Sequence, residues 1–140
     1  RKKDLIVTSG GKNIAPQNIE NLLKTDRYIS QAMVYGDRRH YLTAVLTLDM
    51  EEIGPYARAH NIPYHRPEEL TAQPQIRQLV ESRVVALNQR LASYETIKKF
   101  IIAPTDFSPE NGLLTPTLKV KRKVVTQQYQ TQLEQLYQEC

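Results

Sequence analysis

Cysteine is almost absent from this 140-residue sequence, and the only one, Cys140, is the last residue. No disulfide can therefore form within the chain, which fits a reducing compartment and leads us to expect a cytoplasmic location. No apolar run approaches the roughly 20 residues that a helix needs to span a bilayer. We therefore expect any membrane contact to be peripheral.

Glycine is also scarce, and its distribution excludes the common phosphate-binding loops. The chain has five glycines and contains neither G-x-x-x-x-G-K followed by Ser or Thr nor G-x-G-x-x-G. His40, His60 and His65 lie without metal-ligand spacing, and one cysteine cannot build a zinc site, so we expect the chain to hold no metal. No G-x-S-x-G signature indicates a serine hydrolase.

Basic residues outnumber acidic ones by 19 to 15, which gives a formal charge of +4 and a pI near 9.2. This excess favours an anionic partner such as a nucleotide, a nucleic acid or a lipid headgroup, although many solvated surfaces carry as much. The tyrosines are not interleaved with Lys and Arg as a base-stacking surface requires. A small basic nucleic-acid-binding module stays an alternative, and its binding would weaken steeply with rising salt.

The apolar pattern predicts one α+β domain with a small three-stranded sheet, packed helices and a separate N-terminal β-hairpin. Residues 5–14 form the expected hairpin, with a turn that its glycines permit. Strands are predicted at residues 29–35, 41–48 and 98–102. In the second of these strands the alternate leucine and alanine positions share one face and the threonines occupy the other.

The same pattern places helices between and after the strands. Pro16 suits the first turn of a helix. Asp49 and Glu52 have the spacing of a capping box at the start of another helix. Apolar residues form one stripe over residues 76–91, and a single final helix presents one apolar face over residues 125–137.

A lysine in a proline-broken polar loop, Lys119, stands just before the basic start of the final helix. A primary amine on such a loop suits a phosphate or carboxylate target, because an ammonium group stabilises negative charge that builds between two anions. The alternative is that Lys119, Lys121, Arg122 and Lys123 form only the solvated start of that helix. The positive end of the helix dipole does not favour cations there, which supports the functional reading.

Two adjacent glycines, Gly10 and Gly11, lie between Ser9 and Lys12 in the expected hairpin. Paired glycines let a backbone adopt positive φ and approach a ligand closely. The alternative is an ordinary hairpin turn.

Residues 1–20 and 110–119 together resemble the closing domain of the adenylate-forming superfamily, and are similar to long-chain fatty acid–CoA ligases in particular. The resemblance covers residues 1–140 as the small, mobile C-terminal domain, whose partner is a large N-terminal domain not in this sequence. It implies a ligase that activates a fatty acid with ATP to acyl-AMP and then forms acyl-CoA. A ligase that transfers the acyl group to an acyl carrier protein is a close alternative.

The resemblance also implies roles for particular residues. Lys119 matches the adenylation lysine, Arg1 the arginine on the nucleotide ribose, and Lys3 the hinge, where many relatives have aspartate. Residues 9–12 match the loop that lines the CoA channel during thioester formation. ATP with Mg²⁺ and CoA are implied as substrates of the full-length enzyme, with none held by this domain alone and no nucleic acid as partner.

One departure concerns the lysine loop itself. Many relatives have Ser-Gly-Lys where this chain has Thr117, Leu118 and Lys119. Lys121 is therefore a rival for the catalytic role. The isolated chain is expected to be inactive.

Overall fold

Five strands form two separate sheets in the structure, a computed structural model that describes residues 6–39, 41–104 and 106–138. Strands β1 (Ile6–Val7) and β2 (Asn13–Ile14) pair antiparallel as a hairpin. The three-stranded sheet has the order β3-β4-β5. The predicted α+β class with a separate hairpin is confirmed.

The central strand of the larger sheet is β4 (Leu42–Leu48), which is buried along its whole length. It pairs antiparallel with β3 (Ile29–Tyr35) and parallel with β5 (Ile97–Ile102). The sequence predicted β3 at both ends and the other two strands to within one residue at their N-terminal ends. The parallel pairing arises because the chain crosses over through residues 49–96 before it returns as β5.

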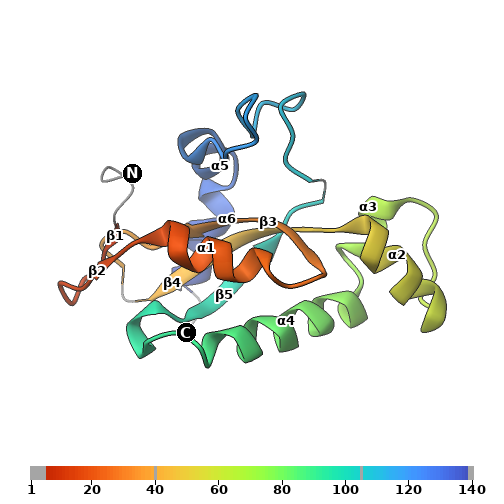
Figure 1. Ribbon diagram of the computed structural model, residues 1–140, viewed down its shortest axis with the longest axis horizontal. Helices are drawn as coiled ribbons and strands as arrows, with labels where there is room; N and C mark the ends of the chain where they lie inside the picture. Colours follow the sequence, from red (N-terminus) through yellow and green to blue (C-terminus); the bar gives the residue numbers. More distant parts are fainter. Residues whose placement is uncertain (1–5, 40, 105, 139–140) are drawn as a thin grey trace.

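Helices cover both faces of this sheet, and each face has its own apolar core (Figure 1). On one face lie α1 (Pro16–Lys24) and α4 (Pro74–Asn88), which contact β3 and β5 respectively. On the other lie α5 (Arg122–Gln128) and α6 (Gln130–Gln138). The alternation along the strands explains both cores, because successive side chains point to opposite faces.

The predicted threonine face of β4 is therefore buried, as is the leucine and alanine face. Thr43 and Thr47 are both fully buried, and their hydroxyls are satisfied by hydrogen bonds. Thr47 Oγ1 donates to Asp106 Oδ1 at 2.6 Å, which ties the strand to the loop that leads toward Lys119.

The predicted single final helix is divided at Tyr129, whose backbone (φ −108°, ψ 13°) leaves the helical region. Hydrogen bonds still continue across the break, from Tyr129 N to Val125 O and from Leu133 N to Tyr129 O. These three residues consequently stay in one apolar cluster across the break.

The N-cap predicted at Asp49 is confirmed, but the capping box with Glu52 does not form. Asp49 is the N-cap of α2 (Met50–Ala59) and accepts a hydrogen bond from Glu51 N. Its own backbone N–H donates to Tyr28 O, so it is not available to Glu52. The Glu52 carboxylate instead pairs with Arg27 at 2.7 Å.

Two short elements complete the description: α3 (Pro67–Leu70), a single turn within the proline-rich connection, and a 3₁₀ turn, η2 (Ser93–Glu95). Over the residues that the structure describes, every helix is too short or too polar to cross a membrane.

Candidate functional site

Lys119 lies at the base of a tight, internally bonded turn. Thr115 N donates to Lys119 O at 2.7 Å, and Leu118 N donates to Thr115 O at 2.8 Å. The Thr115 hydroxyl accepts from Lys119 N, and an antiparallel bridge joins Leu114 to Val120. The Lys119 side chain is exposed. The turn therefore holds the lysine backbone while leaving its ammonium group free to reach out.

Leu118 occupies the strained position of this turn, with φ +66° and a side chain that is 60% exposed. This left-handed conformation is the one that glycine adopts without steric cost. In the Ser-Gly-Lys version of the motif, the glycine stands at the position of Leu118 and suits the same positive φ. In this chain the conformation is held by the bonds between Thr115 and Lys119.

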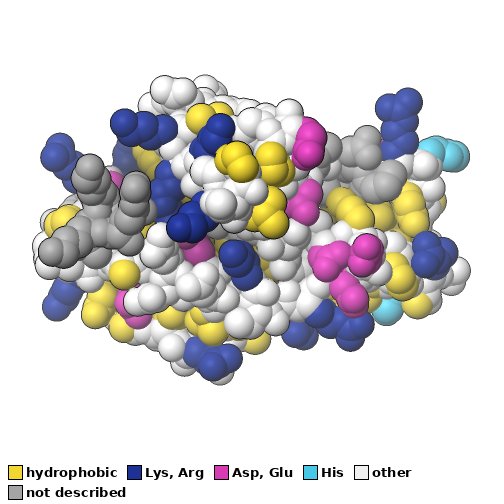
Figure 2. Space-filling model, turned by 45° about the horizontal axis from the view of Figure 1, so that its top comes forward, with side chains coloured by type: hydrophobic (Ala, Val, Ile, Leu, Met, Phe, Trp, Pro, Cys, Tyr) yellow, Lys and Arg dark blue, Asp and Glu magenta, His cyan; other side chains and the backbone are white. Residues whose placement is uncertain are grey.

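The Lys119 turn forms one wall of a groove of about 760 Å³, whose other wall is α1. Five basic side chains and one acidic side chain line it, together with polar and small residues from α1, β3 and the turn. The charged members are Lys24, Lys119, Lys121, Arg122, Lys123 and Glu20. Figure 2 brings the α5 side of the domain forward and shows Lys and Arg side chains spread across it. The groove is suited to an anionic ligand.

Arg122, at the start of α5, is not a solvated residue as the alternative reading of this segment assumed. Its guanidinium donates to both carboxylate oxygens of Glu20, at 2.6 and 2.5 Å. Glu20 also accepts from Val34 N at 2.8 Å, and burial raises its pKa above the ordinary value although the bond from Arg122 opposes this. The pair fastens the Lys119 segment to α1 and β3.

This arrangement does not suit metal binding by the groove itself. Among the described residues that line it, Glu20 is the one carboxylate, and both of its oxygens are engaged. Within the described residues no group of three or more His, Cys, Asp or Glu side chains could hold a metal ion.

The glycine loop is a second exposed turn, at the tip of the β1–β2 hairpin. Thr8 closes it at both ends: its N–H donates to Lys12 O, its carbonyl accepts from Gly11 N, and its hydroxyl accepts from Lys12 N. Gly11 has φ +85°, so this position requires glycine, whereas Gly10 does not. Ser9 and Lys12 are exposed beside them.

The hairpin is held on the domain by the turn between β3 and β4, a contact that the sequence patterns did not reveal. Val7 N donates to Asp37 Oδ1 at 3.1 Å, and Arg38 N donates to Val7 O at 2.7 Å. Ser9 N donates to Arg39 O at 3.0 Å. The sequence Gly-Asp-Arg-Arg at residues 36–39 has residue types that favour a turn, but nothing in it marks a support for another loop.

The two candidate loops do not share one site. Lys119 and its rival Lys121 line the same groove, and residues 9–12 are not among its lining. In Figure 1 the glycine hairpin lies at the left edge and the loop before α5 at the top. Arg1 and Lys3 lie outside the described residues.

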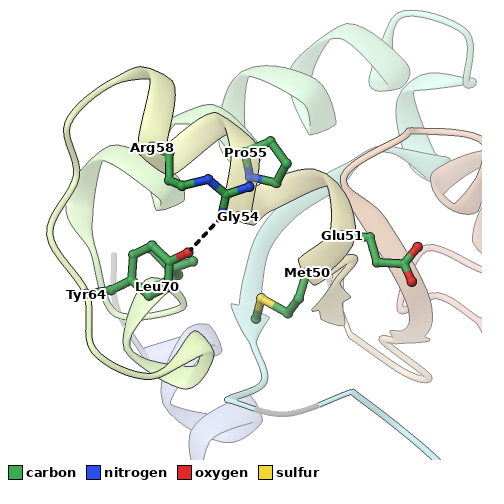
Figure 3. A pocket seen from close by; sticks show the side chains of 7 residues that line it. All are labelled: Met50, Glu51, Gly54, Pro55, Arg58, Tyr64 and Leu70. Carbon is green, nitrogen blue, oxygen red and sulfur yellow. Dashed lines mark hydrogen bonds between the residues drawn. The ribbon is translucent and has the colours of Figure 1, made fainter.

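A smaller cavity of about 260 Å³ lies on α2, at the far right of Figure 1. Figure 3 shows Arg58 and Tyr64 pointing toward one another across its mouth, joined at 3.4 Å. Gly54 and Leu70 line it, and Glu51 points away from its centre. No sequence motif falls on this cavity.

Comparisons with known proteins identify the family of this small α+β domain. The family model described as "AMP-binding enzyme C-terminal domain" matches residues 3–140. The chain belongs to this family.

Curated relatives are long-chain fatty acid ligases. The chain is 38% identical over 138 residues to a long-chain-fatty-acid–CoA ligase of Mycobacterium tuberculosis, covering 98% of the chain and 23% of that protein. It is 35% identical over 140 residues to long-chain-fatty-acid–CoA ligase 5 of Rattus norvegicus, covering 99% and 20%. The chain thus spans only a fifth to a quarter of the length of these relatives.

Solved structures agree with the fold. The adenylation domain of a carboxylate reductase from Mycobacterium chelonae superposes with a TM-score of 0.79 at 25% identity, covering 99% of this chain and 20% of that one. The didomain of a carboxylic acid reductase from Segniliparus rugosus, in complex with AMP, gives 0.77 at 27% identity, covering 99% and 18%.

Proposed function

We propose that the chain is the mobile C-terminal domain of an AMP-forming long-chain fatty acid–CoA ligase, and that Lys119 is its adenylation lysine. The observation that carries this proposal is the exposed Lys119 on a bonded turn in a groove with five basic side chains and one engaged carboxylate. The identity of 35–38% to fatty acid ligases over nearly the whole chain supports the substrate class.

In the first half-reaction a fatty acid carboxylate oxygen attacks the α-phosphorus of ATP, and pyrophosphate leaves. Negative charge builds on the oxygens between two anions, and the Lys119 ammonium stabilises that charge more than it stabilises the separate reactants. Mg²⁺ enters with ATP as part of the substrate. No step needs a metal ligand from this domain.

In the second half-reaction the CoA thiol attacks the acyl carbon of acyl-AMP, loses its proton and displaces AMP. We assign residues 9–12 to the channel for this thiol. At Gly11 the hairpin tip has no side chain and a positive φ, so a ligand can approach its backbone closely. Because the two loops lie in separate places, we infer that the domain turns between the half-reactions, with Lys3 as hinge. Arg1 holds the nucleotide ribose in this scheme.

A second candidate acceptor is the thiol of a carrier protein. The likeness to a carboxylic acid reductase didomain, at 27% identity, favours it, whereas the higher identity to CoA ligases favours CoA. Adenylation is the same in both. We further propose a cytoplasmic enzyme with peripheral membrane contact, because long acyl chains partition into bilayers.

The test is the substitution Lys119→Ala in the full-length enzyme, with Lys121→Ala as its matched control from the same groove. Lys119→Ala removes the charge that stabilises the adenylation transition state, so acyl-adenylate formation should fall by roughly two to three powers of ten. Thioester formation from preformed acyl-adenylate should remain largely intact. Fatty-acid-dependent exchange of pyrophosphate into ATP measures the first step, and release of AMP from added acyl-adenylate and CoA measures the second.

If Lys121→Ala gives this pattern and Lys119→Ala does not, the catalytic lysine is Lys121. If the wild-type full-length enzyme shows no exchange with any long-chain fatty acid, the proposed function is wrong.

A further inference from the structure

We propose that Arg39, Glu134 and Tyr137 are positioning residues for the glycine loop, so that the C-terminal helix α6 controls the second half-reaction. This inference rests on the proposed function for the role of the loop. The network that carries it lies on the side of the sheet opposite α1 and α4, and it has no place in the adenylation chemistry assigned to Lys119.

The first link is the backbone of Arg39. Its carbonyl oxygen accepts from Ser9 N at 3.0 Å, and the preceding residue donates its N–H to Val7 O at 2.7 Å. These bonds meet the last residue of β1, Val7, and the residue immediately before Gly10, Ser9. The β3–β4 turn therefore fixes the direction in which the hairpin tip leaves the domain.

The second link is the side chain of the same residue. The Arg39 guanidinium donates to Glu134 Oε1 on α6, and its carbon lies 4.9 Å from the centroid of the Tyr137 ring. The other Glu134 oxygen accepts from Tyr35 Oη at 2.9 Å. Arg39 thus joins the glycine loop through its backbone and α6 through its side chain.

The third link makes α6 a firm support. The Tyr137 ring stacks on Tyr41 with centroids 4.8 Å apart, and its hydroxyl donates to Tyr41 O at 2.9 Å. Tyr41 Oη donates in turn to Leu136 O at 2.7 Å. Burial raises the pKa of Tyr137 to about 12, above an ordinary value that already leaves the hydroxyl protonated at neutral pH.

A loop held only by its own turn would move with the hairpin, because a two-stranded hairpin is marginally stable by itself. The contact through Arg39 couples the position of the hairpin to the position of α6. Since small displacements of a positioned group reduce rates strongly, loosening Glu134 should slow acyl transfer while the Lys119 groove continues to work.

The experiment compares Glu134→Ala with Glu52→Ala in the full-length enzyme. Glu52 is a matched control, because it pairs with Arg27 on the surface and its side chain is 36% exposed, against 31% for Glu134. Transfer from preformed acyl-adenylate to CoA should fall about tenfold in Glu134→Ala, less than the roughly hundredfold that a 1 Å misplacement can cause. Adenylation should change less than about twofold, and the control should leave both steps within the same limit.

Glu134→Gln keeps an acceptor oxygen for Arg39 and should recover most of the transfer rate, which a loss of folding would not allow. Equal loss of both half-reactions, or unchanged transfer in Glu134→Ala, would overturn the inference.

Amide hydrogen exchange at residues 6–12 is a readout that needs no activity. If the wild-type enzyme fails to adenylate fatty acids, the proposed function fails alone, and faster exchange in Glu134→Ala still decides whether α6 holds the loop.

Discussion

Two residues with positive φ shape the two candidate loops, and they differ in what the conformation costs. Gly11 adopts φ +85° freely, because it has no Cβ. Leu118 adopts φ +66° at a cost of about 1 kcal/mol, and its side chain is too exposed to recover this by burial. The lysine turn is consequently maintained by its hydrogen bonds, whereas the glycine turn is maintained by its residue type.

Substitution of the two adjacent glycines separates these effects. Gly11→Ala should lower the unfolding free energy by about 1 kcal/mol and slow acyl transfer, because alanine is strained at this φ. Gly10→Ala is the control, since its Cβ would meet only Thr8 Oγ1 at 3.9 Å, and it should be nearly neutral for stability. Urea unfolding and the two half-reaction assays measure the outcomes. If a well-folded Gly11 variant lost adenylation and kept transfer, the loops would have been assigned in reverse.

Elements with a clear period were predictable from the sequence, and contacts distant in sequence were not. β4 followed from its alternating pattern, and local motifs singled out Lys119 and residues 9–12 as candidates. The supports of these loops are pairs such as Arg39 with Glu134, separated by 95 positions, and Glu20 with Arg122, separated by 102. Charge partners at such distances depend on topology, which no local pattern encodes.

The attachment of α5 gives a prediction at this scale. Arg122→Ala leaves the Glu20 carboxylate buried without its charged partner, so the unfolding free energy should fall by about 3 kcal/mol. Arg27→Ala is the control; it breaks an ion pair whose arginine side chain is 66% exposed and should cost under about 1 kcal/mol.

The loss in Arg122→Ala should also depend on pH. Burial already raises the pKa of Glu20, and without Arg122 it rises further. A raised carboxyl pKa stabilises the fold when the group is protonated, and that contribution is lost as pH increases through the folded-state pKa. The difference from wild type should therefore be largest at neutral pH and shrink toward acid pH, as urea titrations across this range would measure. A difference that grows with acidity would contradict the assigned role of the pair.

For the whole molecule, we expect the isolated chain to unfold cooperatively but to have no ligase turnover. Two apolar cores, one on each face of the sheet, supply the stability. The groove at Lys119 offers basic side chains, whereas the proposed mechanism also needs the large N-terminal domain of the full-length enzyme. Measurable AMP release from ATP, fatty acid and CoA by the purified chain would contradict this, and the full-length protein is the positive control.

Burial of both faces of the sheet has a consequence for motion. Among the described residues the large apolar side chains left exposed are scattered: Val7, Val85, Tyr94, Leu118 and Val124. A domain that buries its own apolar side chains exposes little new apolar surface when it leaves a partner, and we expect its contacts with another domain to be polar and hydrated. Such contacts can be exchanged within microseconds to milliseconds. The domain can thus rotate as a rigid body between two docked orientations without exposing its own core.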